Sequence, residues 1–306
     1  MLYDQVLITG ANGLLGQTLT QHLSASTNYE VTATARDDTP RFDAACEYIP
    51  MDVTTPDEVK EVLNTVDPDV VVNCAAVSDV AECENDRNRA WAVNARAVRT
   101  LAKGCRERRA HIVQISSDFV FNGKRGPYDE NGRPDPVNYY GRTKLASENA
   151  LREFDFLDWT IVRTVLLYGT AQDLSRSNVV LWMIDQLSSG NTIHVVNDQW
   201  RTPTYVWDLA DGIERVISRN QTGIYHISGR EMVTIHELAE TVADVFRLDP
   251  GLIDPVSSDY FDDAVARPSK TGFIILKAET ELGYDPHDLE TGLRALGREL
   301  DLAPSS

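Results

Sequence analysis

The chain has 306 residues, 42% of them hydrophobic, which is enough for one large α/β domain or a large domain with a smaller companion. Its formal net charge of −18 would repel nucleic acid and anionic membranes, so we expect neither as a partner. No stretch approaches the roughly 18 to 20 apolar residues of a membrane span, and the N-terminus lacks a signal-peptide pattern, so we expect a cytoplasmic protein.

The four cysteines form no CxxC pair and have no histidines nearby at the spacing of a metal site. Cys74 ends an apolar run and is most simply a small buried side chain. We therefore predict no disulfide, no structural zinc and no other metal site.

Apolar runs alternate with segments of helical spacing in the first half of the chain. Such alternation is typical of βαβ units with right-handed crossovers, and it predicts an α/β fold with a doubly wound parallel sheet of the Rossmann type. The predicted strands cover residues 5–10, 29–36, 47–53, 68–76, 111–118 and 159–169, and predicted helices cover 55–66 and about 85–108.

The regular alternation of predicted strands and helices ends at about residue 170. We predict a dinucleotide-binding domain over residues 1–170, to which the segment of about 192–228 returns, and a smaller α+β substrate-binding domain from 171–191 and 229–306. The predicted elements here are helices at 178–190, 204–218, 234–246 and 289–300, with short strands at 192–196 and 223–228.

A glycine-rich loop, "TGANGLLG", separates the first predicted strand from the helix behind it and contains Gly10, Gly13 and Gly16. Glycines allow backbone N–H groups to approach an anion closely, and a helix N-terminus favours negative charge. The alternative is merely a tight turn. Because the loop lies between a strand and a helix of a βαβ unit, we favour binding of a dinucleotide pyrophosphate.

The residue about 20 positions beyond the loop helps to distinguish NADP from NAD. Here that residue is Arg36, whose guanidinium suits a 2′-phosphate. Asp37 and Asp38 follow, and either could instead hold a ribose hydroxyl. We therefore expect NADP(H), with NAD(H) as the alternative.

The segment "NYYGRTK" places Tyr140 and Lys144 four residues apart, so in a helix they share a face. A nearby ammonium group would lower the pKa of the tyrosine and make it a usable general acid. A lone pair of this kind is more often a surface feature, but the glycine loop upstream favours the catalytic interpretation.

With these two motifs, the chain resembles the extended short-chain dehydrogenases/reductases over nearly its whole length. The resemblance implies that Tyr140 is the acid and that Lys144 also binds the nicotinamide ribose. It implies a third catalytic residue at the end of the fifth strand, where "ISSDFVFNG" offers Ser117, a better match than Ser116. Tyr139 is one residue out of phase with the motif.

Three longer segments are similar to the dTDP-4-dehydrorhamnose reductase group: "SSDFVFNGKRGPYDENGRPDPVNYYGRTKLASE", "VVNDQWRTPTYVWDLA" and "RPSKTGF". The similarity implies NADPH-dependent reduction of the 4-keto group of a nucleotide-activated sugar, most simply dTDP-4-dehydrorhamnose to dTDP-L-rhamnose. Related 4,6-dehydratases carry Asp-Glu after the hydroxyl residue, whereas Phe119 follows Asp118 here and has no proton to transfer.

The same resemblance implies two sets of binding residues. The cofactor set is Gly10, Asn12, Gly13, Leu14, Leu15, Gly16, Arg36, Asp52, Val53, Cys74, Ala75, Ala76, Tyr140, Lys144 and Arg163. The candidate substrate residues are Asp118, Gln199, Trp200, Arg201 and Arg267.

Two alternatives stay open. One is a sugar-nucleotide epimerase, which would retain its cofactor. The other is a non-catalytic NADP-binding regulatory subunit, because the chain also resembles the β subunit of methionine adenosyltransferase. A homodimer is possible, since pairing of helices equivalent to 85–108 and 139–153 is common in the superfamily.

Overall fold

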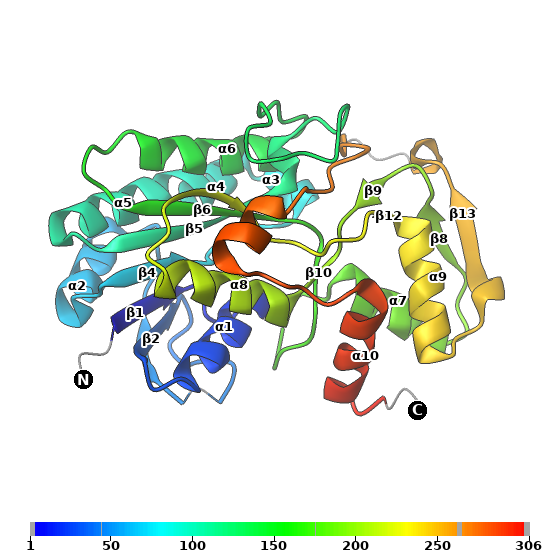
Figure 1. Cartoon of the computed structure of the whole chain (residues 1–306), viewed down its shortest axis with the longest axis horizontal. Helices are drawn as coiled ribbons and strands as arrows, with labels where there is room; N and C mark the ends of the chain where they lie inside the picture. Colours follow the sequence, from blue (N-terminus) through cyan, green and yellow to red (C-terminus); the bar gives the residue numbers. More distant parts are fainter. Residues whose placement is uncertain (1–3, 44, 175, 262–264, 303–306) are drawn as a thin grey trace.

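The fold is organised around a seven-stranded parallel sheet, in a computed structural model that describes residues 4–43, 45–174, 176–261 and 265–302. The strand order β11-β6-β5-β4-β1-β2-β3 confirms the predicted doubly wound sheet, with one further strand at the β6 edge (Figure 1). The strands are β1 Asp4–Thr9, β2 Tyr29–Ala35, β3 Glu47–Pro50, β4 Val70–Asn73, β5 His111–Ser117, β6 Trp159–Thr164 and β11 Gly223–His226.

Helices cover both faces of the sheet, because neighbouring residues of each buried strand point to opposite faces. Val6 and Ile8 of β1 belong to the core shared with α1 (Leu14–Ser24) and α8 (Val206–Ser218). Leu7 belongs to the opposite core, and the helices that contribute to it are α2 Pro56–Val66, α5 Ala97–Arg108 and α6 Tyr139–Arg152.

Two predicted elements are interrupted. The helix expected over 85–108 begins earlier and consists of α3 (Val80–Asn85), α4 (Arg87–Trp91), a π-helical turn (Ala92–Arg96) and α5. The break lies at Asp86, whose side chain accepts a hydrogen bond from Arg89 N and starts a new helix. The strand expected over 159–169 is also divided, since Leu166 adopts φ +39° between β6 and β7 (Leu167–Tyr168).

The later part of the chain builds a smaller group of elements beside the sheet, labelled α7, α9, β8 and β13 in Figure 1. Here β8 (Ile193–Val196) pairs in parallel with β13 (Ile253–Val256), a strand that the Pro- and Gly-containing sequence did not predict. The other elements are α7 Val179–Ser188, β9 Trp200–Arg201, β10 Thr204–Tyr205, β12 Val233–Thr234, α9 Ile235–Phe246, a π-helical turn Ala278–Leu282, α10 Leu289–Glu299, and 3-10 turns at Asp118–Val120, Pro250–Leu252 and Ser258–Tyr260.

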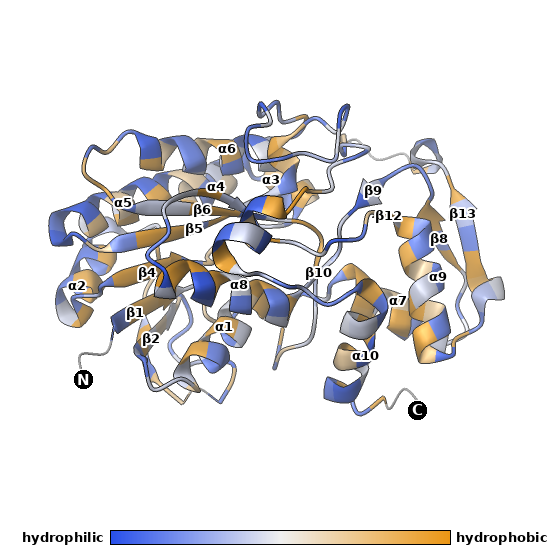
Figure 2. Ribbon diagram, viewed as in Figure 1, coloured by the Kyte–Doolittle hydropathy of each residue, from blue (hydrophilic) through white to orange (hydrophobic). Residues whose placement is uncertain are grey.

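Local sequence explains several of these boundaries. Thr234 and Glu237 form a reciprocal capping box at the start of α9, and Pro56 stands in the first turn of α2. Figure 2 shows hydrophobic and hydrophilic residues along both α8 and α9, as expected for helices with one buried face.

None of the helices that the structure describes has the length and apolar character needed to cross a membrane. The proposed domain boundaries stay a prediction.

A buried ion pair fixes α6 on the sheet. Arg163 on β6 donates from Nε and Nη2 to the two carboxylate oxygens of Glu148 on α6, at 2.8 and 2.7 Å. Both side chains are at most 1% exposed. Ser116 donates to the same carboxylate at 2.7 Å, and His226 Nε2 lies 3.3 Å from Arg163 Nη1. The pair therefore joins the catalytic-motif helix to the centre of the fold.

Replacing Arg163 by leucine is expected to lower the free energy of unfolding by about 3 to 5 kcal/mol, because the buried charge of Glu148 would keep only its longer contact with Arg152, at 3.4 Å. The matched control is Arg99→Leu, which removes the exposed pair with Glu153 and should cost at most about 1 kcal/mol. Urea denaturation of both variants measures the difference. Equal losses would show that the buried pair has no special role.

Candidate active site

A cavity of about 1370 Å³ opens at the carboxyl ends of the central strands. Its lining includes residues that follow β1 and β4, the end of β5, and parts of α6, α7 and β8. The strand order reverses between β1 and β4, which is where parallel α/β sheets bind their ligands.

The glycine loop forms one wall of this cavity. Gly10 has φ +68°, and a Cβ at this position would lie 2.6 Å from Ala75 N. A Cβ on Gly16 would overlap the carbonyl oxygen of Gly10, while Gly13 is the N-cap of α1. The backbone is therefore packed in a way that only glycine allows, and it places the free N–H groups of the first turn of α1 beside the cavity. This arrangement fits a pyrophosphate group.

The end of β2 carries the residues that would distinguish NADP from NAD. Arg36 is exposed and is not among the residues that line the cavity. Asp37 accepts hydrogen bonds at 2.8 Å from both Arg41 Nε and Asn12 Nδ2, and these bonds lower the pKa of its carboxyl group, the bond from Arg41 most strongly. Arg41 also donates from its backbone N to Asn12 Oδ1. The sequence did not single out Arg41, because its approach depends on the loop after β2.

The predicted cofactor residues divide into two groups. Asp52 accepts hydrogen bonds from the backbone and hydroxyl of Thr54, and Arg163 is held by Glu148, so these two side chains are engaged elsewhere. The cavity lining brings together Gly10, Gly13, Leu14, Leu15, Gly16, Cys74, Ala76, Tyr140 and Lys144, but not Asn12, Arg36, Asp52, Val53, Ala75 or Arg163.

The first two turns of α6 present Tyr140 and Lys144 to the cavity. Asn138 caps the helix by accepting from Gly141 N at 2.8 Å. Gly141 is needed here because a Cβ would overlap the carbonyl oxygen of Phe119, so the helix approaches the end of β5 closely. Tyr139 instead lies under the guanidinium of Arg87, 5.0 Å from its ring centre, and is absent from the lining.

The protonation of Tyr140 differs from the expectation. Burial raises the pKa of Tyr140, and the Ser117 hydroxyl only partly opposes this effect. The predicted lowering of its pKa by Lys144 is therefore wrong for this structure. Burial also lowers the pKa of Lys144 to about 8, with Glu148 acting in the opposite direction. Tyr140 accordingly keeps its proton at neutral pH, which is the form that a general acid needs.

Ser117 and Asp118 form a polar cluster next to Tyr140. Ser117 Oγ donates to Asp118 Oδ1 at 2.9 Å, and Thr271 donates to the other carboxylate oxygen. Burial raises the pKa of Asp118, although Arg201, with Nε 3.7 Å from Oδ2, opposes the shift. Ser116 points instead to Glu148. Thr271 is a contact that the sequence did not predict, since 153 residues separate it from Asp118.

The candidate substrate residues are only partly brought together. Arg201 donates to Gln199 Oε1 at 3.2 Å and to the carbonyl oxygen of Pro268 at 2.8 Å. Trp200 pairs through its backbone with Thr234 and does not line the cavity. Asp118, Gln199, Arg201 and Arg267 all do.

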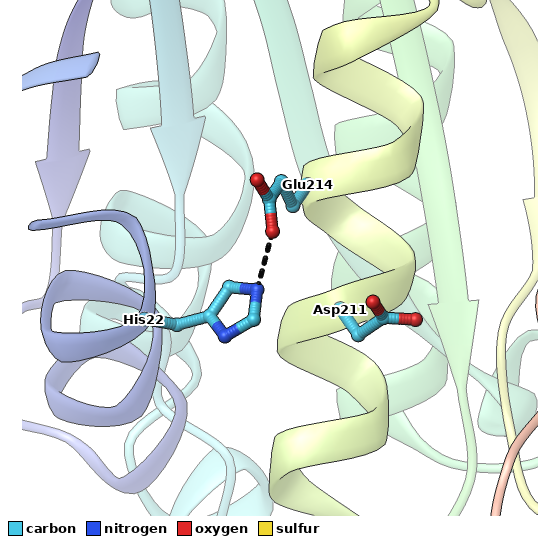
Figure 3. Close-up of side chains that lie close together, drawn as sticks. All are labelled: His22, Asp211 and Glu214. Atoms are coloured by element: carbon cyan, nitrogen blue, oxygen red, sulfur yellow. Dashed lines mark hydrogen bonds and ion pairs between the residues drawn. The ribbon is translucent and has the colours of Figure 1, made fainter. Parts of the chain in front are cut away.

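Within the described part of the chain, one group of side chains has the composition of a metal site, between α1 and α8 and outside the cavity lining (Figure 3). His22 Nε2 lies 2.6 Å from Glu214 Oε2. Asp211, the third member, has a carboxylate oxygen within 4.8 Å of the ligand atoms of the other two and accepts from Arg215 Nε at 2.6 Å. Because both acids already have cationic or hydrogen-bonding partners, we interpret the group as a link between two helices and assign no metal to it.

Comparison with known proteins identifies the family to which the chain belongs. The model of the RmlD substrate binding domain matches residues 4–301. The chain belongs to the RmlD substrate binding domain family. A dTDP-4-keto-6-deoxy-D-glucose reductase of Streptomyces niveus is 35% identical over 269 residues, which are 88% of each chain.

Two further family relatives cover most of the chain. The crystal structure of dTDP-4-dehydrorhamnose reductase from Bacillus anthracis in complex with NADP superposes with a TM-score of 0.85 at 31% identity, covering 97% of this chain and 100% of that one. The β subunit of methionine adenosyltransferase 2 from Rattus norvegicus is 32% identical, covering 90% of this chain and 82% of the relative.

The lowered pKa of Lys144 predicts how the free energy of unfolding changes with pH. Between about pH 8 and pH 10.5 the unfolded chain holds a proton that the folded chain has lost, so this residue makes the free energy of unfolding rise with pH. The free energy of unfolding of the native protein minus that of Lys144→Met should therefore rise by about 1.5 kcal/mol from pH 8 to pH 9.5. Lys103→Met, at an exposed position on α5, is the control and should show no such growth in chemical denaturation.

Proposed function

We propose that the protein is an NADPH-dependent reductase that converts the 4-keto group of a nucleotide-activated sugar to a hydroxyl, most simply dTDP-4-dehydrorhamnose to dTDP-L-rhamnose. One observation carries the proposal: Ser117, Tyr140 and Lys144 line the same cavity as the glycine loop. The identity of the sugar nucleotide is inferred from the names of the reductase relatives.

The residues present fit the cofactor. The loop of Gly10, Gly13 and Gly16 with the N-terminus of α1 would hold its pyrophosphate, and Arg36 and Arg41 are the cations near the end of β2 that would meet a 2′-phosphate. NADPH, when bound, supplies a hydride. Lys144, which lines the cavity one helical turn from Tyr140, would hold the nicotinamide ribose.

The proton for the substrate oxygen would come from Tyr140 on α6, beside Ser117 at the end of β5. When the carbonyl carbon accepts the hydride, its oxygen becomes an alkoxide and takes the proton of Tyr140. Ser117 would donate to the same oxygen once its hydroxyl turns from Asp118, which accepts it in this structure, towards the substrate.

Replacing Tyr140 by phenylalanine is expected to lower the rate of NADPH oxidation with dTDP-4-dehydrorhamnose by about a hundredfold or more, the size expected for loss of a general acid. Binding of NADPH should change little. Tyr139→Phe is the matched control, since that ring packs under Arg87 outside the cavity and should retain activity. Full activity of the Tyr140→Phe variant would show that Tyr140 is not the proton donor.

The regulatory alternative is supported by one relative, the methionine adenosyltransferase 2 β subunit. A protein of that kind would bind NADP and a partner enzyme but oxidise no NADPH with any keto sugar. An epimerase would return its hydride to the sugar and keep its cofactor through purification. Measurement of net NADPH consumption separates both from the reductase. The homodimer and the cytoplasmic location stay predictions.

A further inference from the structure

The hydroxyl of Ser117 has one proton, and in this structure that proton is directed at the neighbouring residue. Ser117 Oγ donates to Asp118 Oδ1 at 2.9 Å and accepts from the backbone N of Phe119 at 3.2 Å. A serine hydroxyl can donate only one hydrogen bond. As long as Asp118 accepts it, Ser117 has no proton to offer to the substrate oxygen.

Turning Ser117 away from an ionised Asp118 would be costly, because the carboxylate is buried. Asp118 is 3% exposed, and its side-chain donors among the described residues are the hydroxyls of Ser117 and Thr271. Thr271 is itself fully buried and donates to Oδ2. If Ser117 turned away, Oδ1 of an ionised Asp118 would be a buried charged oxygen that had lost its side-chain donor.

The cation that faces Asp118 does not hydrogen-bond to it. Arg201 on β9 has its Nε 3.7 Å from Asp118 Oδ2, which is too long for a hydrogen bond. The two Nη groups of Arg201 donate instead to uncharged oxygens, those of Gln199, Trp200, Pro268 and Ser269. Burial, and after it the charge of Arg267, lower the pKa of Arg201.

The other side of Asp118 faces Tyr140 on α6, which is neutral. A charge on Asp118 would raise the pKa of Tyr140 further, in addition to the effect of burial. Burial also raises the pKa of the Asp118 carboxyl group itself, and the charge of Arg201 is the main opposing effect. The surroundings of Asp118 therefore favour its neutral form.

We propose that Asp118 works as a neutral carboxylic acid that donates a hydrogen bond to Ser117, so that the Ser117 hydroxyl is free to donate to the substrate oxygen. The hydrogen bond across the 2.9 Å between Ser117 Oγ and Asp118 Oδ1 then runs in the opposite direction. Thr271 still donates to Oδ2, and Ser117 Oγ accepts from both Asp118 and the backbone N of Phe119. A carboxyl group that is kept neutral by burial can act as a donor in this way.

The inference rests on the proposed function, and it gives Asp118 a positioning role through Ser117 rather than a direct contact with the substrate. Asp118 keeps its own proton throughout the reaction. The proton that reaches the product is that of Tyr140, while Ser117 stabilises the developing alkoxide by donating a hydrogen bond to it.

The test measures kcat/KM for NADPH oxidation by dTDP-4-dehydrorhamnose from about pH 5 to about pH 9. The native value should fall as the pH rises through the pKa of Asp118, because the ionised carboxylate accepts the Ser117 proton again. Asp118→Asn has an N–H donor in place of Oδ1 and cannot ionise, so the ratio of its kcat/KM to the native value should rise by up to about tenfold per pH unit. Asp135→Asn replaces an exposed carboxylate outside the cavity lining and is the matched control, with a constant ratio.

Two further variants test the same cluster. Thr271→Val removes one donor to the carboxylate, so it should raise the pKa of Asp118 and move the fall in activity to higher pH, a measurement that does not need an Asp118 variant to fold. In a Ser117→Ala background, Asp118→Asn should no longer change the pH dependence, because Asp118 acts through Ser117.

Infrared difference spectroscopy detects the neutral acid directly. The spectrum of the native protein minus that of Asp118→Asn, both saturated with NADPH, should contain the carbonyl band of a protonated carboxyl in the pH range of highest activity. A band that persists at every pH together with a constant activity ratio would also support the inference, because the carboxyl group then stays neutral throughout.

Absence of this band in the pH range of highest activity would overturn the inference, because Asp118 would then act as a carboxylate. The same conclusion would follow if the gain of Asp118→Asn at high pH persisted in full without Ser117, or if Thr271→Val left the fall in activity in place or moved it to lower pH. The reductase proposal fails separately: with no oxidation of NADPH by the keto sugar, the infrared band still decides whether Asp118 is neutral.

Discussion

The placement of α6 against the ends of β5 and β6 is the constraint on which the site depends. The Glu148–Arg163 pair holds the middle of the helix, and Gly141 lets its first turn touch the carbonyl of Phe119. With both contacts in place, Tyr140 and Lys144 can only face the cavity that begins at the glycine loop. A shift of one residue along the helix would present Tyr139 instead and separate the acid from Ser117.

Burial then determines the chemistry of these residues more than their mutual charge does. The same desolvation raises the pKa of Tyr140 and lowers that of Lys144 to about 8. In both Tyr140 and Lys144, burial disfavours the charged form. Glu148 links the two constraints, because the carboxylate that anchors α6 through Arg163 is also the group that most favours the charged form of Lys144.

The parts that the sequence predicts well are local. The strand positions follow from alternating apolar runs, and the glycine loop and the Tyr140–Lys144 spacing are each contained within a few residues of sequence. The parts that it misses depend on the folded chain: the loop after β2 that brings Arg41 to Asp37, and the contact of Thr271 with Asp118 across 153 residues. The pairing of Arg163 with Glu148 cannot be recognised from spacing alone, since the two are on different elements.

The most direct test of the account follows the hydride itself. NADPH deuterated at both C4 positions of the nicotinamide would be incubated with dTDP-4-dehydrorhamnose, and the sugar product analysed by NMR and mass spectrometry. The account predicts one deuterium at C4 of the sugar and one NADP⁺ formed for each product molecule. A product without deuterium, or no product despite bound NADPH, would contradict it and favour the epimerase or the regulatory subunit respectively.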